Sequence, residues 1–316
     1  MYLSFYHFAA EPFRLTPDPR FLHLAQPHRD ALTGLIQGVA QRKGFVVLTG
    51  PIGTGKTTVL RASLELLTDQ VFNGTPLASA FIVNPTLTRE EFLEYLLEEF
   101  EIQCGSVSKP RRLIALQKML LSTQKQGGTA VLIVDEAHLL SAELLEEIRL
   151  LSNADLDREK LLQVVLCGQP ELLTLLQRPD LQALRQRVAS WSLLRPLTLP
   201  ETRVYIAERM HVAGLEGASP FSSAALEEIH RHGQGVPRLI NLICDQCLRT
   251  GYTTQQEKIG VHIVEDAAGE LALTTSTTGA AGLLPPGLAP LRNSTTWSTV
   301  DSLIETMKHS RATARE

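Results

Sequence analysis

The feature that most restricts the fold of this chain is a glycine-rich loop over residues 50–57, between a strand-like and a helix-like segment. The apolar residues 44–49 before it are typical of a buried strand, and residues 57–67 after it have helical periodicity. Glycines permit the backbone turns that let successive N–H groups surround an anion, and the start of the helix adds a favourable field. This order of elements predicts a phosphate-binding loop in an α/β sheet.

The loop residues have predicted roles in binding ATP and Mg²⁺. Lys56 is expected to reach the β- and γ-phosphates, and the Thr57 hydroxyl is expected to coordinate Mg²⁺. The residues expected to surround the nucleotide are Gly50, Gly53, Thr54, Gly55, Lys56, Thr57 and Thr58.

A second motif consists of two acidic residues, Asp135 and Glu136, that follow the apolar segment 131–134. Open α/β sheets bind ligands where their strands end, so both carboxylates are expected at that edge. Asp135 is predicted to hold Mg²⁺, and Glu136 to orient and deprotonate an attacking water as the catalytic base. Together with the loop, this pair predicts nucleotide hydrolysis.

The rest of the chain alternates between strand and helix patterns up to about residue 196 and is helical afterwards. This pattern predicts a parallel sheet sandwiched by helices, followed by a small all-helical lid domain. The predicted domains are 1–195 (α/β domain with an N-terminal wrapping segment), 196–271 (helical lid), and 272–316 (linker and short terminal helix). The terminal helix is expected to carry Trp297, Val300, Ile304 and Met307 on one face.

Three further polar positions are candidates for the site. Gln169 follows the strand 161–167 and is expected near the γ-phosphate or the attacking water, although a plain strand-end turn is the alternative. Arg187, with Arg185 in reserve, is the candidate for an arginine that reaches a neighbouring subunit's γ-phosphate. Arg238 begins a predicted helix and is expected to respond to bound nucleotide. For all three arginines, an ordinary surface or helix-start residue is the alternative.

Composition narrows the possible functions. A net charge of −4 and an aromatic content of 5% argue against a chain that is basic throughout or rich in base-stacking surfaces. No secretion signal is expected, and no apolar run approaches the ~20 residues of a membrane-spanning helix. A cytoplasmic protein without an integral membrane segment, or one peripheral at the inner membrane, is therefore expected. Cys244 and Cys247 lie among apolar residues of a predicted helix, which favours packing over metal binding.

Several motifs resemble the ExeA/GspA family of AAA+ ATPases, which is associated with type II secretion and pilus systems. The similar segments are residues 2–6, 11–13, 16–22, 28–32, 43–50, 168–172 and 235–241. The resemblance implies a P-loop NTPase fold of the AAA+ kind and supports the roles of Lys56, Thr57, Asp135, Glu136 and Arg238. It also places His28 at the edge of the adenine pocket.

The resemblance further implies a homo-oligomer, a ring or a filament, and a secretion or pilus assembly protein as partner. Trp191 stands where a second arginine is expected, and the membrane span and peptidoglycan-binding domain of the secretion proteins are not in this sequence. That difference leaves open a DNA transposition regulator of the MuB/TnsC type, which binds DNA and recruits a transposase. A signalling ATPase that acts only as a switch is a third alternative. Secretion or surface-structure assembly ranks above transposition because the N-terminal motifs match so closely.

Overall fold

The computed structural model describes residues 2–15, 25–68, 75–83, 85–105, 108–153, 155–156 and 159–271. They fall into two compact units. The helical unit takes the described residues up to Arg29, the loop Pro51–Thr58 and the described residues from Arg195 to Leu271. The sheet unit takes Asp30–Gly50 and Val59–Leu194. The segment 16–22 of the family resemblance and the predicted linker and terminal helix over 272–316 lie outside the described residues, and the predicted domain boundaries stay predictions.

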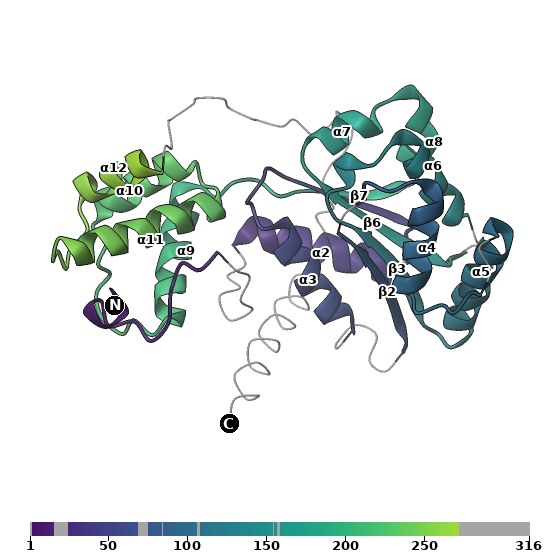
Figure 1. Cartoon of the computed structure of the whole chain (residues 1–316), viewed down its shortest axis with the longest axis horizontal. Coiled ribbons are helices and arrows are strands. Elements are labelled where there is room, and N and C mark those ends of the chain that lie inside the picture. Colours follow the sequence, from purple (N-terminus) through teal and green to yellow (C-terminus); the bar gives the residue numbers. More distant parts are fainter. Residues whose placement is uncertain are drawn as a thin grey trace. The chain divides into compact units, whose positions relative to one another are not determined.

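The sheet unit is built on five strands in the order β2-β3-β6-β1-β7 (Figure 1). Every pairing is parallel, so the carboxyl ends of all the strands lie at one edge. Three of the strands, β1, β3 and β6, are buried along their whole length, as expected for a parallel sheet covered on both faces. The bounds are β1 Phe45–Thr49, β2 Leu77–Ile82, β3 Thr129–Val134, β6 Leu162–Gly168 and β7 Val188–Leu193.

Helices cover both faces of this sheet (Figure 1). Alternate strand residues, such as Val47 and Leu132, face one core shared with α4 to α8. On the other face α2 packs closely, since a Cβ at Gly38 would lie 2.3 Å from Val46 Cγ2. The bounds are α2 Gln26–Ala40, α3 Lys56–Leu66, α4 Arg89–Glu99, α5 Lys109–Lys125, α6 Ala142–Leu151, α7 Glu171–Leu176 and α8 Gln182–Arg185, with 3₁₀ turns η3 Ala137–Leu139 and η4 Pro179–Leu181.

The helical unit has its own apolar core, to which the N-terminal residues contribute. Tyr2, Tyr6, Phe8 and Phe13 are buried in it. The Tyr2 hydroxyl donates to Asp245 at 2.7 Å, and Arg209 Nε donates to the Pro12 carbonyl at 2.6 Å. The N-terminal segment therefore belongs with the helices α1 Tyr2–Phe5, α9 Leu199–Val212, α10 Ser223–Gly233, α11 Pro237–Thr253 and α12 Val261–Glu270.

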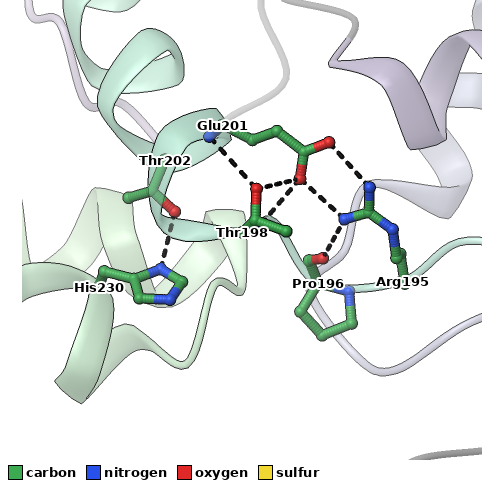
Figure 2. A network of polar contacts seen from close by, with 6 residues as sticks. All are labelled: Arg195, Pro196, Thr198, Glu201, Thr202 and His230. Carbon is green, nitrogen blue, oxygen red and sulfur yellow. Dashed lines mark hydrogen bonds and ion pairs between the residues drawn. The ribbon is translucent and has the colours of Figure 1, made fainter.

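The first turn of α9 is fixed by a polar network (Figure 2). Thr198 and Glu201 form a capping box, in which each side chain bonds the backbone N–H of the other residue. The same carboxylate receives two hydrogen bonds from Arg195, at 2.7 and 2.8 Å. These hydrogen bonds lower the pKa of Glu201 to about 2, and those from Arg195 have the largest effect. One side chain thus caps α9 and ties the preceding residues to it.

The predicted fold class is confirmed, and two β elements were missed. β7 has three polar or small residues among its six, and only Ser190 is buried, so it lacks the apolar run that identified the other strands. The hairpin of β4 (Asp155–Leu156) and β5 (Glu159–Lys160) is too short for any periodicity. Within the described ranges, no helix has both the length and the hydropathy required to cross a bilayer.

Candidate nucleotide-binding site

The glycine-rich loop adopts a conformation that requires glycine at two positions. Gly53 has a φ of 79° and Gly55 a φ of 97°, in the region that L side chains rarely adopt. A Cβ at Gly53 would lie 2.8 Å from Arg238 Cβ, so the loop also needs the space. At Gly55 a Cβ would lie 3.2 Å from His28 Nε2. Both glycines therefore permit close approach of residues from α2 and α11.

Three carbonyl groups of the loop accept hydrogen bonds from defined donors. The Pro51 carbonyl accepts from Lys56 Nζ at 3.0 Å and from the Thr54 hydroxyl at 2.8 Å. The Gly53 carbonyl accepts from the Arg238 backbone N–H at 3.2 Å. The Thr54 carbonyl accepts from His28 Nε2 at 2.9 Å. Carbonyls held in this way fix the orientation of the loop peptides, which is what a cradle for phosphate needs.

Arg238 is carried to the loop by a tight turn before α11. Gly235 has a φ of 70°, and a Cβ there would lie 2.0 Å from the Leu197 carbonyl oxygen. The Leu197 N–H in turn donates to the Gly235 carbonyl at 2.8 Å. The Arg238 side chain is exposed at the start of α11. Its backbone is thus bound to the phosphate loop, while its guanidinium stays accessible.

The acidic pair lies where β3 ends in the sheet unit. Asp135 is buried, with 2% of its surface exposed, and its N–H donates to the Ile82 carbonyl at 2.8 Å. Its Oδ1 accepts from the Glu136 N–H at 2.9 Å. The backbone of Glu136 adopts the left-handed helical conformation, with φ 51° and ψ 34°. A non-glycine residue in this region costs of the order of 1 kcal/mol and is concentrated at functional sites, so the turn is a specific feature of this edge.

His138, in η3, links the ends of β3 and β6. Its Nδ1 lies 3.4 Å from Glu136 Oε2 and 3.4 Å from the Gln169 backbone nitrogen. A Cβ at Gly168 would lie 3.0 Å from the backbone nitrogen of His138, so glycine is needed for this approach. One ring nitrogen cannot donate to the carboxylate and accept from the amide simultaneously. Glu136 Oε2 is buried with no hydrogen bond in the described part of the chain.

Arg185 and Arg187 are the candidates for the finger arginine, which reaches the γ-phosphate of a neighbouring subunit. They lie in different surroundings at the end of α8. Arg187 Nη1 donates to the Arg149 carbonyl at 3.4 Å and to Asn153 Oδ1, both at the C-terminal end of α6. A positive side chain is stabilised at the C-terminal end of a helix by the helix dipole, and Arg187 lies at such an end. The Arg185 side chain is exposed and makes no hydrogen bond or ion pair with any residue that the structure describes.

The cysteine pair of α11 is packed in the apolar core. Cys244 and Cys247 are both fully buried. Burial raises the pKa of both thiols, to about 12 for Cys247, which opposes the thiolate form that binds metals. Among the described residues, no three His, Cys, Asp or Glu side chains are grouped so as to hold a metal ion.

The predicted residues thus gather in two places. Gly53, Thr54, Gly55, His28 and Arg238 meet in the helical unit, and Asp135, Glu136 and Gln169 lie at the strand ends of the sheet unit. Gly50 bridges β1 and β6, since its N–H donates to the Gly168 carbonyl at 3.2 Å. Sequence reasoning missed the contact of His28 with the loop and the role of Gly168.

Known proteins with similar sequences or folds provide a comparison for the whole chain. Residues 39–176 match the family model described as an AAA domain. Over 300 residues the chain is 37% identical to "General secretion pathway protein A" of Aeromonas hydrophila. The chain is therefore similar to this secretion protein and, over residues 39–176, to AAA domains. The match covers 94% of this chain but 53% of the relative, so the chain spans about half of that protein's length.

Solved structures with a similar fold are more distant in sequence. The Aeropyrum pernix ORC2 protein, in ADPNP–ADP complexes, aligns with a TM-score of 0.60 at 14% identity, over 82% of this chain and 71% of that one. Drosophila ORC bound to DNA aligns with a TM-score of 0.64 at 18% identity, over 99% of this chain and 79% of that one. These likenesses show a shared fold of the AAA type.

Proposed function

We propose that the chain binds ATP with Mg²⁺ and hydrolyses it to ADP and phosphate. The observation that carries this proposal is the loop itself, because its glycine conformations and fixed carbonyls suit a phosphate chain. A buried aspartate beside a strained glutamate at the end of β3 supplies the other half of the chemistry.

The loop residues bind the phosphates in this proposal. The backbone N–H groups of Gly53, Thr54 and Gly55 surround the β-phosphate, since successive N–H groups form an anion-binding concavity. Lys56 exchanges the Pro51 carbonyl for the β- and γ-phosphate oxygens. Its small exposed fraction, 6%, restricts the ammonium to the loop and its ligand.

The remaining site residues have separate tasks in this proposal. Thr57 and Asp135 would hold Mg²⁺; both offer oxygen atoms, the ligands that this ion prefers. When bound, the ion supplies charge neutralisation for the phosphates. Glu136 orients the attacking water and takes its proton, while Gln169 contacts the water or the γ-phosphate. Arg238, next to Gly53, responds to the nucleotide.

A neighbouring subunit completes the site in this proposal, and the chain acts as a homo-oligomer. The contacts of Arg187 with α6 favour Arg185 as the arginine that crosses to the neighbour, because Arg185 has no bonds to give up in the described structure. Arg187 remains the alternative from the sequence.

The biological process that we infer is assembly of a type II secretion or pilus-like system, with the protein at the cytoplasmic face of the inner membrane. The supporting observation is the identity with General secretion pathway protein A. Transposition regulation has no comparable support, because the DNA-bound structure of similar fold is only 18% identical.

The experiment is phosphate release from ATP, with nucleotide binding measured in parallel. The wild type should hydrolyse ATP with Mg²⁺ and stop when EDTA is added. Lys56→Ala should lose tight ATP binding, whereas Lys118→Ala, which removes an exposed lysine of α5, should behave as the wild type. Equal hydrolysis by Lys56→Ala and the wild type would contradict the proposal.

A further inference from the structure

We propose that His28 is a positioning residue, which holds the Thr54–Gly55 peptide so that the Gly55 N–H faces the phosphate chain. This inference rests on the proposed nucleotide binding and assigns His28 a task other than adenine contact.

The hydrogen bond between His28 and the loop defines the orientation of one peptide. His28 Nε2 lies 2.9 Å from the Thr54 carbonyl oxygen. A carbonyl can only accept, so Nε2 carries the hydrogen. In a planar trans peptide the N–H points opposite to the C=O, and the Gly55 N–H therefore points away from His28. The ring thus controls a phosphate donor without touching the phosphate.

The surroundings of His28 keep its ring in this arrangement. It lies in the first turn of α2, where its backbone N–H donates to the Ala25 carbonyl at 2.9 Å. The side chain is buried, with 6% of the residue exposed, and burial lowers its pKa, which favours the neutral ring. Arg195 and Glu201 act on this pKa in opposite directions. A neutral ring has one N–H, and the Thr54 carbonyl fixes it on Nε2.

The close contact with Gly55 points the same way. A Cβ at Gly55 would lie 3.2 Å from His28 Nε2, so ring and loop backbone meet with no atom between them. The neighbouring Gly53 carbonyl is held by a backbone donor, the Arg238 N–H, which side-chain substitution does not remove. At Thr54 the donor is a side chain, and its contribution can be measured.

Three substitutions separate the hydrogen bond from the volume of the ring. His28→Leu removes the donor and keeps an apolar side chain of moderate size. His28→Gln places an amide N–H at the distance of Nε2, whereas the amide of His28→Asn reaches only as far as Nδ1. Binding of ATP is measured directly, and binding of inorganic triphosphate by competition, because triphosphate has no base. The kcat and KM for ATP are measured on the same samples.

Loss of one neutral hydrogen bond corresponds to an increase in Kd of about fivefold to tenfold. His28→Leu and His28→Asn should show this increase for ATP and, by the same factor, for inorganic triphosphate. Their KM should rise while kcat changes by less than about twofold, because the loop binds ground state and transition state alike. His28→Gln should bind within about twofold of the wild type. If His28→Leu does not fold, the comparison of His28→Gln with His28→Asn decides.

Three results would overturn the inference. One is ATP affinity unchanged in both His28→Leu and His28→Asn. Another is binding of ATP by His28→Gln that is as weak as binding by His28→Asn. The third is weaker binding of ATP with unchanged binding of triphosphate, which would place His28 at the base instead. A wild-type protein that binds neither ligand would refute the proposed function itself, so the two failures are distinguishable.

Discussion

The phosphate loop and the strand edge at Glu136 are held in opposite ways. Each of three loop carbonyls has a donor, and two of the donors come from other elements, α2 and α11. At the strand edge, Glu136 has a left-handed backbone and a buried carboxylate oxygen without a hydrogen bond in the described structure. His138 Nδ1 is close to that oxygen but is shared with the Gln169 N–H.

The contrast teaches which step each region controls. Several independent bonds fix the loop, so its geometry is prepared for the ligand before binding, which favours affinity. The carboxylate of Glu136 has only the His138 ring nitrogen, at 3.4 Å, near its Oε2, and this oxygen makes no hydrogen bond within the described residues. We therefore expect changes around the loop to alter binding, and changes at the strand edge to alter turnover.

A large expected effect tests whether the strand edge of one subunit is sufficient for turnover. Arg185→Ala should lower the ATPase rate on the order of 10³-fold, with little change in Kd for ATP, if this arginine completes a neighbour's site. Arg187→Ala should mainly weaken the contacts at the end of α6. Mixing Arg185→Ala with Lys56→Ala protomers should restore part of the activity, in a concentration-dependent way.

The mixing experiment can contradict the assignment of Arg185. If the two variants assemble together and the mixture stays inactive, Arg185 does not act across subunits. If Arg187→Ala has the rate loss and is complemented by Lys56→Ala, the finger is Arg187, as the sequence first suggested.

A smaller effect sharpens the description of the loop as a prepared site. Gly235→Ala should destabilise the protein by about 2 kcal/mol or more, because it combines an unfavourable φ with a collision against the Leu197 carbonyl. ATP affinity should fall as well, since the turn carries the Arg238 N–H to Gly53. Gly217→Ala, where no atom lies within 4 Å of the new Cβ, is the matched control. Thermal unfolding that is equal for the two variants would show that the turn is not a constraint.

The smallest effect concerns the start of α9. The folded pKa of Glu201, about 2, is below the ordinary value of 4.5, so its stabilisation is present above pH 4.5 and is lost as the pH falls towards 2. Glu201→Gln should therefore cost about 1 kcal/mol near neutral pH, a modest value because Arg195 is half exposed. The difference from the wild type should shrink between pH 5 and about pH 3. The exposed Glu216→Gln is the control, and an unfolding difference that grows as the pH falls would contradict the assignment.

Most of the sheet could be predicted because β1, β3 and β6 are apolar runs that need no tertiary information. β7 could not, since half of its residues face solvent or carry small polar side chains. The phosphate loop and the acidic pair are also local patterns. The bond from His28 to Thr54 and the contact of Gly235 with Leu197 depend on the meeting of distant segments, which residue spacing does not reveal. The finger arginine stays a prediction because it depends on a second subunit.

The separation of binding from turnover is tested most directly by Glu136→Gln, with ATP binding and phosphate release measured on the same preparation. The amide cannot take a proton from water, so phosphate release should fall by about 10²- to 10⁴-fold, while Kd for ATP stays within about twofold of the wild type. Glu143→Gln, at an exposed position of α6, should match the wild type in both measurements. Normal phosphate release by Glu136→Gln would contradict its role as the base, and a loss of ATP binding would contradict the division of tasks between loop and strand edge.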